Sequence, residues 1–123
     1  MTPTFFIDRC LGFHVVPNAL RLAGYAVETH DSHFSRTGPD EDWLALVGKR
    51  QWIAITKDRR ILTRELSVAN QHRVALFVLI ARQMTGPQMA ETIVKEAPTM
   101  ISMFNSQARP FAALIDKKGV RIR

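Results

Sequence analysis

The sequence predicts an α/β three-layer sandwich, in which a mostly parallel central sheet is flanked by helices. Short apolar runs rich in β-forming residues alternate along the chain with segments of helical period, which is the pattern of such a sheet. Residues 75–80 are apolar throughout, as in a strand that is covered on both faces. A length of 123 residues with 46% apolar side chains suits one compact core. We therefore expect a single domain over residues 1–123.

The first half of the chain is predicted to hold three strands and two helices. The strands are expected at 5–7, 25–27 and 52–56. A helix is expected over 16–24, with Pro17 in its first turn. Residues 30–39 lack a sustained period and are predicted to form a loop. Asp40 then begins a helix that ends near Gly48.

The second half is predicted to continue the alternation and to end in a hairpin. A helix is expected over 61–69, and the central strand follows over 75–80. A further helix is expected over 88–96. Pro98 is predicted to open a separate helix, because proline suits a first turn and interrupts a helix interior. Residues 111–122 are predicted to form a terminal hairpin.

The charge of the chain is basic and unevenly distributed. Seventeen Lys and Arg against eleven Asp and Glu give a net charge of +6. Residues 1–58 carry six basic and seven acidic side chains, whereas residues 59–123 carry eleven and four. This division favours a polyanionic partner such as nucleic acid, and a merely solvated basic surface is the alternative.

Cysteine usage and hydropathy indicate the cellular setting. The lone Cys10 cannot form an internal disulfide, which favours a cytoplasmic location. No apolar run approaches the ~20 residues that span a bilayer. Asp8 and Arg9 stand where a signal peptide would need an apolar stretch. We therefore expect no membrane partner.

Three carboxylates are predicted to meet at one edge of the sheet. Asp8 follows the first strand, Asp58 follows the third after one residue, and Asp40 begins the helix that leads into the third strand. Two charges about 4 Å apart repel by roughly 4 kcal/mol at an effective dielectric of ~20. A hard divalent cation such as Mg²⁺ or Mn²⁺ would offset that repulsion, because it prefers carboxylate oxygens. Helix capping is the structural alternative for Asp40 and Asp58.

These residues resemble a known family. Phe5-Phe6-Ile7-Asp8, then Asp40, and eighteen positions after Asp40 the Asp58 of Thr56-Lys57-Asp58-Arg59-Arg60-Ile61, are similar to the PIN-domain nucleases. The likeness is closest to the short PIN-like branch that includes VapC-type toxins. It implies a PIN-like three-layer sandwich and a metal-dependent ribonuclease that is inhibited by a protein antitoxin. It also implies that Asp8, Asp40 and Asp58 are catalytic and hold Mg²⁺ or Mn²⁺.

The sequence departs from the family in one respect. Typical PIN domains carry a second acid on a helix before the third acid, and here only the loop over 30–39 occupies that region. Asp31 from the loop, or Glu41 or Asp42 from the following helix, are the substitutes that the sequence offers. The number of metals is therefore open, and a catalytically weak or inactive RNA- or protein-binding module is the alternative interpretation.

Basic residues beside the acids are candidates for binding RNA. Four of them cluster around Asp58: Lys57, Arg59, Arg60 and Arg64. On a helix Arg60 and Arg64 share one face and could hold phosphate, whereas a solvated helical face is the alternative. A second basic group at the C-terminus comprises Lys117, Lys118, Arg121 and Arg123, and its role is open. The expected partners are RNA and an antitoxin, with a second copy of the chain as a further candidate.

Histidines and tryptophans elsewhere are assigned structural roles. His30 and His33 flank Asp31 in the polar loop and are predicted to be surface residues rather than metal ligands. Trp43 and Trp52 lie in apolar patterns and are predicted to pack rather than to stack on bases.

Overall fold

A computed structural model describes residues 2–123 of the chain and contains one six-stranded sheet. Its strands are β1 (Phe5–Ile7), β2 (Val27–Thr29), β3 (Ile53–Thr56), β4 (Ala75–Leu79), β5 (Phe111–Asp116) and β6 (Gly119–Ile122). They are arranged in the order β2-β1-β3-β4-β5-β6. Neighbouring strands are parallel except for the antiparallel hairpin of β5 and β6. The carboxyl ends of β1 to β5 therefore lie along one edge of the sheet.

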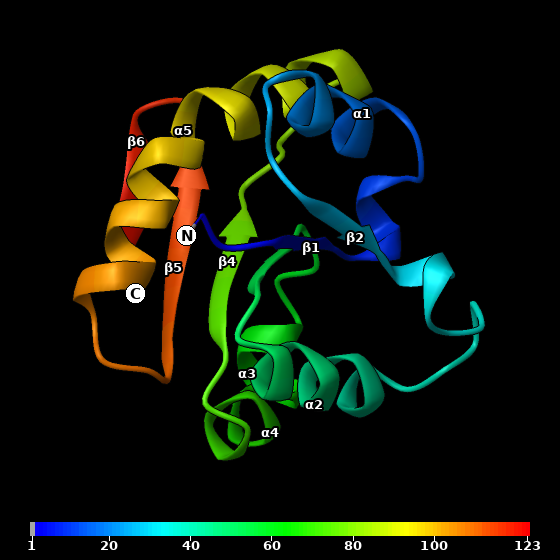
Figure 1. The fold of residues 1–123 in the computed structure, drawn as a ribbon, viewed down its shortest axis with the longest axis vertical. Helices are drawn as coiled ribbons and strands as arrows, with labels where there is room; N and C mark the ends of the chain where they lie inside the picture. Colours follow the sequence, from blue (N-terminus) through cyan, green and yellow to red (C-terminus); the bar gives the residue numbers. More distant parts are fainter. Residues whose placement is uncertain (1) are drawn as a thin grey trace.

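Helices cover both faces of the sheet. They are α1 (Val15–Leu22), α2 (Asp40–Arg50), α3 (Ile61–Arg64), α4 (Leu66–Gln71) and α5 (Gly86–Ser106), with short 3-10 turns η1 (Arg9–Leu11) and η2 (His30–Ser32). Helices α1 and α5 pack on one face, and α2, α3 and α4 pack on the other (Figure 1). The predicted α/β sandwich with a mostly parallel sheet is confirmed. None of the helices within residues 2–123 has the length and apolar character needed to cross a bilayer.

The side chains of the strands divide the core into two halves. In β1, Phe5 and Ile7 face α1 and α5, whereas Phe6 faces α2 and α4, because successive strand residues point to opposite faces. All five residues of β4 are buried, so this strand is covered on both faces as predicted. Phe6 stacks on Trp43 at a ring separation of 5.4 Å, and Trp43 is fully buried, as expected for a packing residue.

Three elements differ from the prediction made for them. Strand β2 begins two residues later, because Val27 rather than Tyr25 is in register with Phe5 of β1. The helix predicted over 61–69 is two short helices that meet at Glu65, whose backbone is not helical. The two helices predicted on either side of Pro98 are one helix, α5, with this proline on its exposed side.

Candidate functional site

The candidate site lies where three neighbouring strands end. Strands β2, β1 and β3 are adjacent and parallel, and at their carboxyl ends stand His30, Asp8 and Thr56. Figure 1 shows β1 and β2 side by side at this end of the sheet. Open α/β sheets bind ligands beyond the carboxyl ends of their strands. Asp58 follows two residues after Thr56 and so belongs to the same edge.

Asp8 is a buried carboxylate with protein donors on both oxygens. It is 5% exposed, and it caps the η1 turn by accepting a 2.7 Å hydrogen bond from the backbone N–H of Arg9. Its Oδ2 accepts a 2.8 Å hydrogen bond from the Thr56 hydroxyl and a 3.4 Å contact from the Cys10 thiol. A carboxylate at this depth requires such donors, because burying an unpaired polar group costs several kcal/mol.

Thr56 connects two of the predicted acids. Its buried hydroxyl donates to Asp8 and accepts a 3.1 Å hydrogen bond from the backbone N–H of Asp58. The backbone of Asp58 is therefore linked to the Asp8 carboxylate through one side chain. In the sequence Thr56 stood out only as part of the Thr-x-Asp step; a hydroxyl two residues before an acid at a strand end is the signal that indicates this linkage.

Cys10, in the η1 turn, packs against the hydrogen bond between Asp8 and Thr56. Its sulfur lies 3.2 Å from the Thr56 Oγ1 and accepts a 3.4 Å hydrogen bond from the backbone N–H of Lys57. Burial, together with the nearby Asp8 carboxylate, raises the pKa of the Cys10 thiol to about 11. The thiol is therefore protonated at neutral pH and is not a nucleophile.

Asp58 is engaged by Arg60. Its Oδ1 lies 3.0 Å from the Arg60 Nε and also accepts the backbone N–H of Arg60, while its Oδ2 lies 3.2 Å from the Arg60 Nη2. These hydrogen bonds lower the pKa of the Asp58 carboxyl. The pair is on the surface, with 70% of the Arg60 side chain and 28% of the Asp58 side chain exposed.

Asp40 stands at the first residue of α2, as predicted. Its Oδ1 accepts a 2.9 Å hydrogen bond from the Trp43 indole N–H, which anchors the start of this helix over the core. Asp40 acts electrostatically on both Arg60 and His30, so it lies on the same side of the molecule as the other acids. Within residues 2–123, however, no three His, Cys, Asp or Glu side chains lie close enough together to hold a metal ion.

His30 is buried, so the prediction that it is a surface residue was wrong. It is 1% exposed and packs against the rings of Phe6 and Phe34. Its Nε2 lies 3.5 Å from the Arg9 Nη1. Burial lowers the pKa of His30 and Arg9 acts in the same direction, whereas Asp8 and Asp40 act against them. The polar loop sequence concealed this burial, because it gave no apolar period around His30.

The three substitute acids lie in exposed positions near the site. Asp31 is in η2, next to His30, and Glu41 and Asp42 are in the first turn of α2. All three side chains are solvent-exposed, and none of them makes a hydrogen bond within the described part of the chain. His33, which was also predicted at the surface, is exposed and pairs with Glu28 at 2.7 Å.

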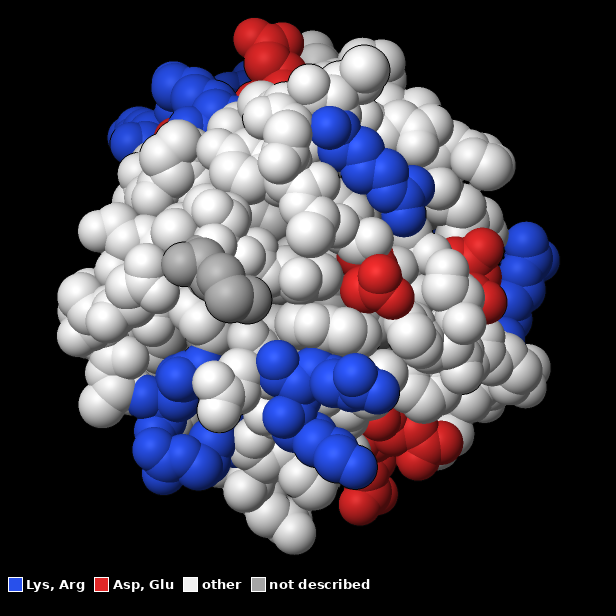
Figure 2. All heavy atoms as spheres, in the orientation of Figure 1, with Lys and Arg blue, Asp and Glu red and all other residues white. Residues whose placement is uncertain are grey.

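The basic residues predicted to bind RNA surround Asp58. Lys57, Arg59, Arg60 and Arg64 are all exposed, and Arg64 contributes to the lowered pKa of Asp58. Arg60 is occupied by Asp58, whereas the other three make no side-chain hydrogen bond or ion pair within residues 2–123. On the face drawn in Figure 2, Lys and Arg lie in several groups separated by uncharged surface. On this face the basic charge is therefore local rather than continuous.

Comparison with known proteins assigns the chain to a family. The sequence pattern of the PIN-like domain family matches residues 3–82, which is more than half of the chain and includes all three acids. A curated protein of Mycobacterium tuberculosis (strain ATCC 25618 / H37Rv), "Putative ribonuclease VapC45", is 37% identical over 60 residues. This alignment covers 46% of the present chain and 44% of that protein. No solved structure matches the chain. The protein described here belongs to the PIN-like domain family.

Proposed function

We propose that this protein is a metal-dependent endoribonuclease of the PIN-like type and the toxin of a toxin–antitoxin pair. It would hydrolyse RNA phosphodiester bonds in the cytoplasm as a single domain, and an antitoxin protein would be its partner. The observation that carries the proposal is the buried Asp8, held by Thr56 at the centre of three strand ends and linked through it to Asp58. The name of the Mycobacterium tuberculosis relative points to the same activity.

The donor chemistry of the site fits a hard divalent cation. Asp8, Asp40 and Asp58 would supply carboxylate oxygens, which Mg²⁺ and Mn²⁺ prefer, and Asp31 or Asp42 would be further ligands. Asp58 would have to exchange Arg60 for the ion, because Arg60 occupies both of its oxygens. Such an exchange costs little, since water screens an ion pair as exposed as this one. When bound, the ion supplies charge that stabilises a phosphodiester under attack.

The protein's own side chains would position the substrate. Lys57, Arg59 and Arg64 are exposed cations beside Asp58 that would hold RNA phosphates. Arg60, once released from Asp58, would join them. Thr56 would keep the Asp8 carboxylate oriented through its hydroxyl. Cys10, whose sulfur contacts both Asp8 and Thr56, would help to exclude water from the hydrogen bond between them.

The proposal is tested by RNA cleavage with single-site variants. Wild type should cleave single-stranded RNA with Mg²⁺ or Mn²⁺ and should lose this activity in EDTA. Asp8→Asn should lower the rate roughly a hundredfold or more. Mutation of a residue that only contacts a metal ligand already lowers metal affinity or activity 10–100-fold. Glu91→Gln is the matched control, because Glu91 is an exposed acid on α5. This helix packs on the face of the sheet opposite to the one that α2 and α4 cover. Equal cleavage by Asp8→Asn and wild type would reject the assignment.

A catalytically inactive binding module is the second candidate. The observation that favours it is the closed Asp58–Arg60 pair, together with the lack of a three-group metal cluster among residues 2–123. A module of this kind would bind RNA or protein with the same affinity in EDTA and in Mn²⁺ and would cleave nothing. Growth arrest on expression, lost in Asp8→Asn, would instead identify an active toxin.

A further inference from the structure

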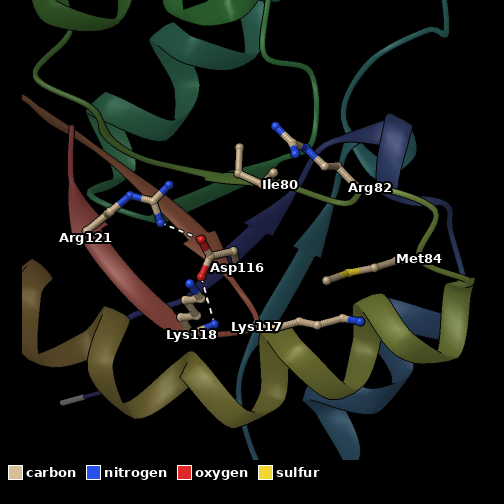
Figure 3. A pocket seen from close by; sticks show the side chains of 7 residues that line it. All are labelled: Ile80, Arg82, Met84, Asp116, Lys117, Lys118 and Arg121. Carbon is tan, nitrogen blue, oxygen red and sulfur yellow. Dashed lines mark hydrogen bonds and ion pairs between the residues drawn. The ribbon is translucent and has the colours of Figure 1, made fainter.

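A second feature of the carboxyl edge is a basic cavity beyond the ends of β4 and β5. Its volume is about 490 Å³, and it is lined by Ile80, Arg82, Met84, Asp116, Lys117, Lys118 and Arg121. Figure 3 shows these side chains coming from the segment after β4 and from the strands and turn of the β5–β6 hairpin, with α5 along one side. The cavity does not include Asp8, Asp40 or Asp58.

The cavity is built to hold an anion. Four of its seven lining side chains are cationic and only Asp116 is acidic. Asp116 is already paired: Arg121 donates to its Oδ2, and the backbone N–H of Lys118 donates to its Oδ1 at 2.8 Å. These contacts fix the turn and hold the Arg121 guanidinium in place. The side chains of Arg82, Lys117 and Lys118 make no hydrogen bond or ion pair within residues 2–123, so they are available to a ligand.

Three of the residues that line the cavity, Ile80, Asp116 and Arg121, belong to the same face of the sheet as Thr56. Thr56 is in register with Val78 of β4, and Val78 with Leu114 of β5. Ile80 comes two residues after Val78, and Asp116 comes two residues after Leu114. Arg121 of β6 is the cross-strand partner of Leu114. Because side chains alternate between faces, all of them point to the side that α2 and α4 cover further along the sheet.

The distance between the two sites suits one nucleic-acid strand. Strand β5 is two places from β3 in the sheet, and adjacent strands lie about 4.8 Å apart, so the two strand ends are separated by about 10 Å. A stacked strand rises ~3.4 Å per nucleotide, so about three nucleotides span this separation. Arg82, which lines the cavity, follows β4, and β4 lies between β3 and β5 in the sheet.

We infer that this cavity binds a backbone phosphate of the RNA strand, about three nucleotides from the phosphodiester that lies at the carboxylates. The inference rests on the proposed function for the identity of the bound strand. Arg82, Lys117 and Lys118 are exposed and long, and they offer charge without a fixed arrangement of donors that would read a base. The site should therefore position RNA regardless of sequence, and it should favour substrates long enough to reach it.

The test compares two doubly substituted proteins with equal loss of charge. Lys117→Ala/Lys118→Ala removes two cations of the cavity. Lys49→Ala/Arg50→Ala removes two exposed cations from the end of α2, which leads into the opposite edge of the sheet. Binding of a labelled 10-nucleotide single-stranded RNA is measured in EDTA, so that cleavage is not needed and failure of the nuclease proposal does not affect the result.

The cavity variant should bind this RNA about tenfold more weakly than wild type, and the control variant should bind it as wild type does. The slope of log affinity against log salt should be shallower by about 0.7 for the cavity variant, because one phosphate contact on a single strand is lost. If the double variant does not fold, judged by circular dichroism, Arg82→Gln replaces it. Equal losses in both variants, or loss of binding to an acidic peptide but not to RNA, would overturn the inference.

Discussion

The hydroxyl of Thr56 donates a 2.8 Å hydrogen bond to the Oδ2 of Asp8, across 48 positions of sequence. The bond joins the ends of two adjacent parallel strands, and both groups are buried. The same hydroxyl accepts the backbone N–H of Asp58. One threonine thus contacts the carboxylate of one proposed ligand and the backbone of another.

Thr56→Val should destabilise the fold by about 1–3 kcal/mol, because it leaves a buried carboxylate oxygen and a backbone N–H without their partner. Thr56→Ser, which keeps the hydroxyl, should recover most of this loss. The free energy of unfolding in urea measures both effects. Thr99→Val is the control at an exposed position of α5, and a loss there equal to that at Thr56 would contradict the role given to the hydroxyl.

Arg60→Gln should strengthen Mn²⁺ binding, because it frees both oxygens of Asp58. Arg59→Gln is the matched control: it removes one exposed cation from the same turn but no partner of Asp58. A Mn²⁺ titration followed by electron paramagnetic resonance distinguishes the two. If both variants gain affinity equally, the effect is one of net charge and not of release of Asp58.

The Asp58–Arg60 pair also predicts how the stability of the fold changes with pH. Arg60 lowers the pKa of Asp58 below its ordinary value of 3.8, so the pair stabilises the fold above that value and the contribution is lost as the pH falls through the lowered pKa. The difference in stability between wild type and Arg60→Gln should therefore be present at pH 7 and vanish on acidification. A difference that grows below pH 4 would contradict the pairing.

Cys10 should react slowly in the folded protein. Its pKa of about 11 keeps the thiol protonated at pH 8, so alkylation by iodoacetamide should be much slower than in urea-unfolded protein. The unfolded thiol ionises near 9.0, so wild type should lose stability between about pH 9 and 11, relative to Cys10→Ser. Rapid alkylation of the native thiol at pH 8 would contradict this environment.

Gly48 should not tolerate a side chain, although it lies within a helix. Alanine normally stabilises a helix interior by up to about 1 kcal/mol over glycine. A Cβ at Gly48 would lie 2.1 Å from the backbone carbonyl oxygen of His72, just after α4. Gly48→Ala should therefore destabilise the fold by about 1–3 kcal/mol or more. Gly86→Ala, whose Cβ would meet only Val15 side-chain atoms at 3.8–3.9 Å, is the control for thermal unfolding and should be neutral.

Much of the fold followed from local sequence. The apolar runs at β1 and β4 predicted their strands because burial on both faces leaves no polar position. The prediction of two helices on either side of Pro98 was wrong, because α5 runs through this residue. The helix continues through it because Ala97 and Met100 are fully buried against the core, and this tertiary packing outweighs the local cost of proline.

The site was predictable in its location and less so in its contacts. The rule that ligands bind at strand ends brought Asp8 and Asp58 to one edge without any knowledge of side-chain geometry. It gave no information on which donor each acid accepts. The pairing of Asp58 with Arg60 and the burial of His30 depend on how short turns fold over the sheet, and no periodic pattern in the sequence encodes those turns.

The central claim is that the carboxylates at the ends of β1 and β3 hold a divalent cation. Calorimetric titration with Mn²⁺ of wild type, Asp8→Asn and Glu91→Gln tests it most directly. The expected result is saturable binding by wild type and Glu91→Gln, and binding at least tenfold weaker by Asp8→Asn. Identical binding by all three proteins, or none by wild type, would contradict the claim.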